Sequence, residues 1–238
     1  MKRFVILGLP RSGTTYLMSL LNAHPDVICA GEHFNPYAVI DDKEDDSHAA
    51  VLGRDKDPVG HMHRFFENAA ARGAFSGGFK FMIGHNLKVL QELAADPELS
   101  IIYVWRENRL AQVSSLIKAF QSKKWAQTKA DAHIQRKIVA TPRQISHRWH
   151  EYATFDHLIA LWLAGLPNPK VTYEYCDLFK PGFEELICGF LEVKHHRRMK
   201  SALVKQGSNA IEDRFEDPRP IRYYFNQIGL GSWLETEI

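Results

Sequence analysis

The chain opens with the pattern that most restricts its fold, an apolar strand followed by a glycine-bounded loop and a helix. Residues 4–7 are apolar, Gly8 to Gly13 form the loop, and apolar side chains then recur at helical spacing at residues 16, 17, 20 and 21. Such a loop presents backbone N–H groups at the positive end of a helix, where an anion is stabilised. The segment therefore predicts a phosphate-binding loop.

The loop has the glycine spacing of a Walker nucleotide-binding motif without its lysine. Gly8 and Gly13 stand at the glycine positions, Thr15 at the hydroxyl position, and Thr14 where the lysine would be. Because that lysine bridges the outer phosphates of a triphosphate, its absence argues against kinase chemistry. A P-loop-fold nucleotide or small-molecule kinase remains an alternative, which Thr14 disfavours.

The stretch Pro-Arg-Ser-Gly-Thr-Thr after a first strand resembles the 5′-phosphosulfate loop of sulfotransferases that use 3′-phosphoadenosine 5′-phosphosulfate (PAPS). The resemblance implies that the 5′ end of PAPS, as co-substrate, is held by one continuous set of residues. These are Arg11, Ser12, Gly13, Thr14 and Thr15.

A second motif extends the resemblance. Residues 101–105 predict a buried strand, Arg106 follows at its carboxyl end, and Ser114 lies two turns along the next helix. In sulfotransferases an arginine and a serine at this spacing bind the 3′-phosphate of the donor. A guanidinium can grip a phosphate through two hydrogen bonds, and a hydroxyl adds another donor.

The resemblance also suggests a general base. Bacterial Stf0/NodH-type sulfotransferases use a glutamate after the second strand, and Glu32 follows the predicted strand at 27–30. The alternative is that Glu32 only orders Arg11 or caps a backbone amide. His33 and His85 are rival bases, and Lys80 would add a cation near the transferred group. A chain without a working base would be a non-catalytic nucleotide-binding module.

The segment 195–238 resembles the C-terminal donor-binding tail of the same bacterial enzymes. Lys205, Gln206, Ser208 and Arg214 stand at the matching positions. The alternative is a solvated basic surface loop.

The remaining apolar runs alternate between strand and helix. Strands are predicted near 79–83 and 171–175, and helices near 63–71, 86–94, 126–139, 142–165 and 183–191. This order predicts a single α/β domain over 1–238, a P-loop-like three-layer fold with a central parallel sheet flanked by helices. Residues 36–62 lack periodicity and carry an acidic run, so we expect a loop insertion there.

Composition narrows the remaining choices. A net charge of +2 indicates neither a nucleic-acid partner nor a membrane surface, and no run is long enough to span a membrane. Three separated cysteines predict reduced thiols in a cytoplasmic protein, and neither a metal site nor a signal peptide is expected. The resemblance to the bacterial sulfotransferases implies that the acceptor is a hydroxyl, or an amine, of a carbohydrate, glycolipid or other small molecule. Aromatic side chains on the helix at 142–165 serve the core or a homodimer contact.

Overall fold

A parallel sheet forms the centre of the computed structural model, which describes residues 1–41, 43–126, 137–203 and 207–238. Its strands lie in the order β2-β5-β1-β6-β7, with bounds β1 (Lys2–Gly8), β2 (Val27–Glu32), β5 (Ser76–Met82), β6 (Ser100–Trp105) and β7 (Lys170–Glu174). Every pair in this sheet is parallel. The carboxyl ends therefore meet at one edge, which carries the phosphate loop after β1 and Arg106 after β6.

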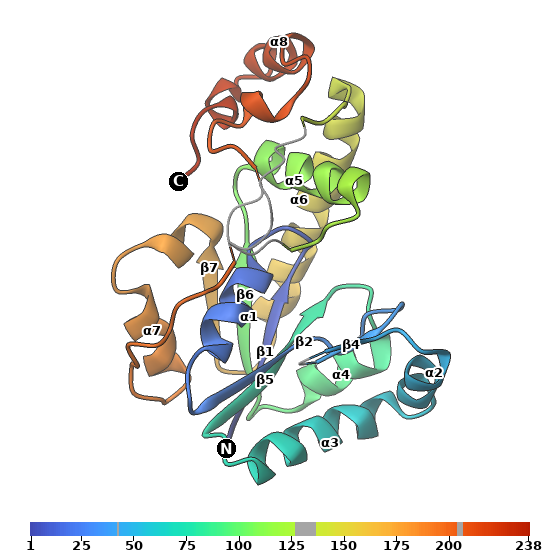
Figure 1. Cartoon of the computed structure of the whole chain (residues 1–238), viewed down its shortest axis with the longest axis vertical. Coiled ribbons are helices and arrows are strands. Elements are labelled where there is room, and N and C mark those ends of the chain that lie inside the picture. The colour runs from blue at the N-terminus through green and yellow to red at the C-terminus, as the bar shows by residue number, and fades with distance from the viewer. Residues whose placement is uncertain (42, 127–136, 204–206) are drawn as a thin grey trace.

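Helices cover both faces of the sheet. One face packs against α1 (Thr14–Asn22) and α7 (Phe183–Phe190), and the other against α3 (Pro58–Ala71), α4 (Leu87–Ala95) and α6 (Pro142–Ala164). Figure 1 shows the strands between these two groups of helices. Side chains alternate between the faces along each strand, so Phe4 and Ile6 enter one core cluster and Val5 and Leu7 the other. The predicted three-layer architecture is confirmed.

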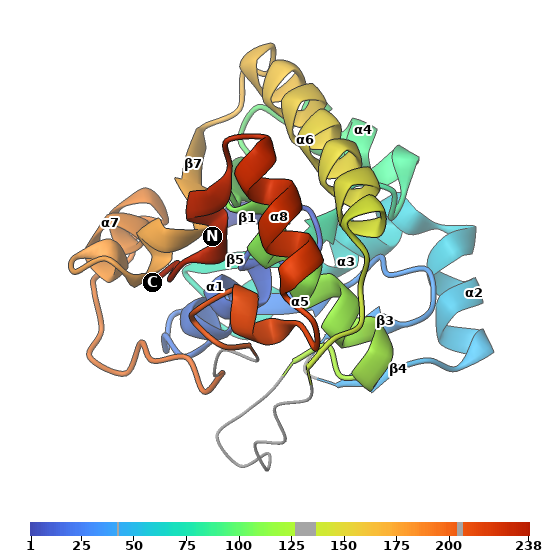
Figure 2. The same cartoon turned by 90° about the horizontal axis from the view of Figure 1, so that it is seen from above.

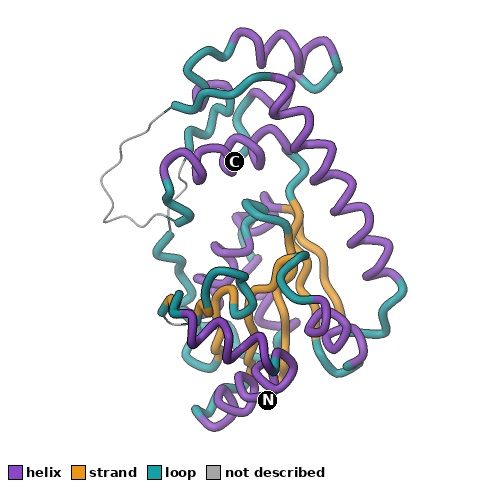
Figure 3. The backbone as a smooth tube through the Cα atoms, turned by 90° about the vertical axis from the view of Figure 1, so that its right-hand side faces the viewer, coloured by secondary structure: helices purple, strands orange, loops and turns teal. Residues whose placement is uncertain are grey.

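A third apolar cluster lies beyond the carboxyl ends of the strands. It joins α5 (Arg109–Ser122), the first turn of α6, α8 (Arg219–Gln227), the short helix η3 (Gly231–Leu234) and the residues that flank the short helix η2 (Glu212–Arg214). Figure 2 shows α8 and α5 above the sheet, and Figure 3 shows the sheet in one half of the molecule and a largely helical part in the other. The phosphate loop lies between these two parts.

The segment 36–62 is folded, so the prediction of a loop is wrong. It contains the antiparallel pair β3 (Val39–Ile40) and β4 (Glu44–Asp45), the helix α2 (His48–Lys56) and the start of α3. Ser47 caps α2 through the amide of Ala50, and Asp57 caps α3 through the amide of Gly60. Because α2 buries only Arg54, its sequence has no apolar stripe to predict it.

Other boundaries moved by a few residues. The helix α3 begins at Pro58 and the strand β5 at Ser76, each earlier than predicted. Most of the helix predicted over 126–139 falls outside the described residues; Ile138, which is described, pairs with Phe215 in an isolated bridge. Among the described helices, none combines the length and apolar character needed to cross a bilayer. On α6, Phe155 is exposed, and a homodimer through this helix stays a prediction.

Candidate active site

The two glycines of the phosphate loop are required by close packing. A Cβ on Gly8 would lie 2.7 Å from both Ser12 Oγ and the backbone oxygen of Val104. Gly13 has a φ of +104°, and a Cβ there would meet the ring of Tyr175 at 2.8 Å. The loop thus folds tightly over the end of the sheet and starts α1 at Thr14.

The phosphate loop contains hydrogen-bond donors without partners among the described residues. The first amides of α1 have no partners within the helix, because the residues one turn before them belong to the loop and are not helical. Ser12 Oγ is fully buried and has no hydrogen-bond partner among the described residues. Thr14 is buried as well, and Thr15 uses its hydroxyl elsewhere in the site. An anion at this helix start would accept hydrogen bonds from the first amides of α1.

Lys80 connects the phosphate loop to Glu32. Its Nζ donates to Thr15 Oγ1 at 2.8 Å and lies 2.7 Å from Glu32 Oε1. Burial lowers the pKa of Lys80, and the carboxylate of Glu32 opposes that shift. Three residues from three different elements therefore form one short polar chain at the carboxyl edge of the sheet.

Glu32 is held as a carboxylate. Burial raises its pKa, but the charge and hydrogen bond of Lys80, helped by a hydrogen bond from Asn35 Nδ2 at 2.6 Å, bring the pKa below its ordinary value. The buried Arg54 donates to the backbone oxygens of residues 33, 35 and 38 and so fixes the turn that carries Asn35. No spacing rule in the sequence pointed to Asn35 or Arg54.

The structure groups His85 with Glu32 and turns His33 away. His85 Nε2 lies 3.6 Å from Glu32 Oε2, and burial lowers the His85 pKa to about 4. Its Nδ1 accepts the amide of Met82, so the proton of the neutral ring is on Nε2, facing Glu32. His33 instead bonds His61 at 3.2 Å against α3.

Arg106 is buried beside the phosphate loop. Its guanidinium lies 4.0 Å from the ring centroid of Tyr175, and its Nη1 donates to the backbone oxygen of Arg11 at 3.0 Å. Its other two nitrogens bind both carboxylate oxygens of Glu237, with Nε 2.6 Å from Oε1. The sequence placed Arg106 at a phosphate site but carried no signal for Glu237.

Arg214 joins the predicted tail to the predicted Arg106 and Ser114 motif. Its Nη1 donates to Ser114 Oγ and to the backbone oxygen of Ala111, both at 3.0 Å. Its Nε donates to the backbone oxygen of Ser208, so Ser208 contributes its main chain to this contact. Arg214 Nη2 is buried and has no hydrogen-bond partner among the described residues. Lys205 and Gln206 lie outside the described residues.

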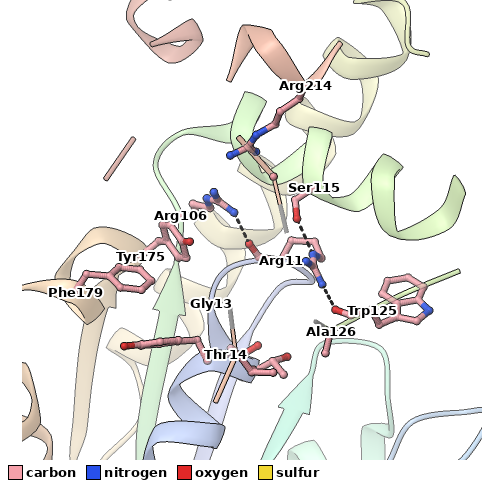
Figure 4. Close-up of a pocket in the computed structure, with 14 residues that line it drawn as sticks. Arg11, Gly13, Thr14, Arg106, Ser115, Trp125, Ala126, Tyr175, Phe179 and Arg214 are labelled. Carbon is pink, nitrogen blue, oxygen red and sulfur yellow. Dashed lines mark hydrogen bonds between the residues drawn. The ribbon is translucent and has the colours of Figure 1, made fainter. Parts of the chain in front are cut away.

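Three arginines line one cavity of about 140 Å³ (Figure 4). Burial, and then the charge of Arg106, lower the pKa of Arg11 and of Arg214 to about 10. Such mutual repulsion favours an anion between the guanidinium groups. The aromatic ring of Phe179 adds an apolar wall, 4.7 Å from that of Tyr16 and 5.1 Å from that of Tyr175. Among the described residues no three His, Cys, Asp or Glu converge as a metal site.

Comparison with known proteins agrees with this geometry. Residues 3–77 match the model of the Sulfotransferase family. Nodulation protein H of Rhizobium tropici is 32% identical over 215 residues, which cover 85% of this chain and 80% of that protein. The chain belongs to the sulfotransferase family. Nodulation protein H of Rhizobium meliloti strain 1021 is 30% identical over 142 residues. This matched region spans 58% of this sulfotransferase-family chain and 56% of the relative.

Two solved structures share the fold. A sulfotransferase from Alicyclobacillus acidocaldarius has a TM-score of 0.53 at 14% identity, covering 99% of this chain and 96% of its own. The sulfotransferase domain from the curacin biosynthetic pathway has the same TM-score and identity, covering 92% and 85%. The predicted P-loop-like sulfotransferase fold is confirmed.

Proposed function

We propose that this protein transfers a sulfuryl group from PAPS to a hydroxyl group of a small acceptor. One observation carries the proposal: Lys80 Nζ contacts Thr15 of the phosphate loop and Glu32 at the same time. An anion-binding loop and a carboxylate that can accept a proton are therefore one side chain apart. Sulfuryl transfer needs this combination of positioning, positive charge and a proton acceptor.

The residues present suit the donor. Arg214 lines the cavity, and its buried Nη2, without a partner among the described residues, marks one position for an acceptor of a hydrogen bond. In our assignment Arg11 and the α1 amides hold the 5′-phosphosulfate, while Arg106, Ser114 and Arg214 hold the 3′-phosphate. The rings that border this cavity offer the apolar surface that an adenine requires.

The chemistry follows from the placement of Glu32 and Lys80. Glu32 takes the proton of the acceptor hydroxyl as that oxygen forms its bond to sulfur. The bond between sulfur and the bridging phosphate oxygen breaks, and the electron pair stays on that oxygen, so 3′-phosphoadenosine 5′-phosphate (PAP) leaves. Lys80 stabilises the negative charge that develops between these groups. Atoms and charge balance without an additional reactant.

His85 and Asn35 position the base in this scheme. The neutral His85 presents its Nε2 proton to Glu32, and Asn35 donates to the same carboxylate oxygen. These two contacts orient one oxygen of Glu32 while Lys80 holds the other. His85 is thus assigned a positioning role and Glu32 the catalytic one.

For the acceptor we propose a carbohydrate, glycolipid headgroup or other small hydroxyl compound, with an amine as the variant to be tested beside it. Membership of the sulfotransferase family supports this class. A cytoplasmic location remains part of the proposal. A panel of saccharides and simple alcohols, read by PAP release, would identify the acceptor class.

Calorimetric titration with PAP tests the donor assignment, with ATP as the comparison and no added metal. We expect PAP to bind, Arg106→Ala to weaken that binding strongly, and ATP to bind poorly. Binding of ATP that depends on Mg²⁺, without a response to PAP, would replace this proposal with a kinase of the same fold. Thr14 at the Walker lysine position makes that second function the less favoured one.

A further inference from the structure

Glu237 forms an ion pair with Arg106, whose guanidinium group we assign to binding of the 3′-phosphate. It binds Arg106 in the two-pronged geometry with which arginine binds a phosphate, and the two side chains are 3% and 4% exposed. The third guanidinium nitrogen donates to the backbone oxygen of Arg11. These contacts engage all three guanidinium nitrogens of Arg106, two of them with Glu237. A phosphate bound to Arg106 in the same two-pronged geometry would use these same two nitrogens.

The cavity lined by Arg106 is small. Its volume of about 140 Å³ is below the roughly 300–1,000 Å³ typical of small-molecule sites. Arg214, which lines the same cavity, also interacts electrostatically with Glu237. The carboxylate thus supplies the negative charge that this group of arginines requires, in the position where a donor phosphate would supply it.

The segment that carries Glu237 is held by hydrogen bonds to its backbone. Thr236 pairs with Ala210 in one isolated bridge, and the backbone oxygen of Glu237 accepts from Cys176 Sγ at 3.4 Å. The backbone oxygen of Glu235 accepts from the Ile211 amide at 3.3 Å, and that of Ile238 accepts from Asn209 Nδ2. Glu235 and Thr236 are exposed, and Ile238 is 38% exposed. Moving residues 235–238 aside would therefore disturb little of the apolar core, whose last member is Leu234.

We propose that Glu237 is a built-in competitor of the donor 3′-phosphate, an autoinhibitory contact that is exchanged when PAPS or PAP binds. The inference rests on the proposed function, because it takes Arg106 as a phosphate-binding residue. The exchange keeps the buried guanidinium paired in both states, which avoids the cost of an unpaired buried charge. The apparent donor affinity is lowered by the fraction of molecules in which Glu237 is bound.

The test compares PAP titrations of the wild type, Glu237→Gln and Glu237→Asp. Glu237→Gln removes the charge but keeps the shape, and we expect it to bind PAP roughly tenfold more tightly or better, because the competent fraction rises. Glu237→Asp, shorter by one methylene, should lie between the two. Glu235→Gln removes an exposed acid from the same segment and should match the wild type. A gain in affinity cannot arise from misfolding.

Hydrogen exchange supplies a second measurement on the wild type. On addition of PAP, exchange in a peptide covering 232–238 should increase, because the segment leaves its site. Unchanged or slower exchange there, or a Glu237→Gln variant that binds PAP no more tightly than the wild type, would overturn the inference. If Arg106→Ala still abolished PAP binding, the proposed function would stand. Failure of both the wild type and Glu237→Gln to bind PAP would instead overturn the donor assignment and the inference with it.

Discussion

Lys80 and Glu32 are paired neighbours on adjacent parallel strands, with their charged groups 2.7 Å apart. The register between β2 and β5 shifts between Ala30 and Glu32, and this irregularity brings Glu32 opposite Lys80. Gly31 lies at the shift, where a Cβ would approach Ile40 to 2.7 Å. A local irregularity of the edge strand β2 therefore places the candidate base, Glu32, beside Lys80.

Replacing Glu32 by glutamine should lower kcat for sulfuryl transfer by about 10²- to 10⁴-fold, because the amide cannot take up the acceptor proton. PAP affinity should change little, since the side chain keeps its size and can still accept from Lys80. Glu44→Gln, an exposed acid on β4, is the matched control. Full activity in Glu32→Gln together with a large loss in His85→Gln would transfer the role of base to His85.

Gln112→Ala should raise KM for the donor more than it lowers kcat. The fully buried Gln112 donates from Nε2 to the backbone oxygen of Pro10 at 2.9 Å and accepts from Arg109, so it holds the phosphate loop onto α5. Loss of these bonds should also cost about 1–3 kcal/mol of unfolding free energy. Steady-state kinetics and urea unfolding measure both effects. Gln121→Ala, on the exposed part of α5, should leave both near wild type.

Two glycine substitutions should have opposite effects on stability. Gly8→Ala places a Cβ 2.7 Å from three atoms, including the backbone oxygen of Val104, and should lower the free energy of unfolding by about 1–3 kcal/mol. Gly53 lies in α2 with open space around it, so Gly53→Ala should raise that free energy by up to about 1 kcal/mol. The urea concentration at the midpoint of unfolding, compared at equal m-values, measures both changes in stability. Equal midpoints for the two variants would contradict the close packing at Gly8.

Stability should fall in mild acid in part through His61. Burial, followed by the nearby charge of His33, lowers the pKa of His61 from 6.5 to about 4. Between these values the unfolded chain binds the proton and the folded protein does not. Proton uptake by His61 in the unfolded chain therefore leaves the free energy of unfolding unchanged above pH 6.5. It lowers that free energy progressively as the pH falls from 6.5 toward 4.

His61→Gln should accordingly flatten the dependence of unfolding free energy on pH over that range, measured by urea unfolding at several pH values. His157→Gln, at an exposed position, should keep the wild-type slope. An unchanged slope in His61→Gln would show that other groups account for the acid sensitivity.

The features that sequence predicted well depend on residues close together in the chain. The strand, loop and helix from Lys2 to Asn22 follow from apolar runs, two glycines and helical spacing, and Arg106 follows from its place after an apolar strand. Residues 36–62 were mispredicted because α2 buries only Arg54 and so has no apolar stripe, and because the apolar stripe of α3 lies mostly beyond residue 61. Of the four residues predicted to bind the donor in the tail, Ser208 and Arg214 lie among the described residues.

By itself the sequence determined where anion-binding groups would arise, because glycine turns, helix starts and strand ends are governed by near neighbours. Only the tertiary structure decided which of those groups meet. The Lys80 and Glu32 pair depends on β2 lying beside β5 and on a shifted register, and the Arg106 and Glu237 pair joins residues 131 positions apart. Such pairs are selected by strand order and by the need of buried charges for partners, and neither is encoded in local spacing.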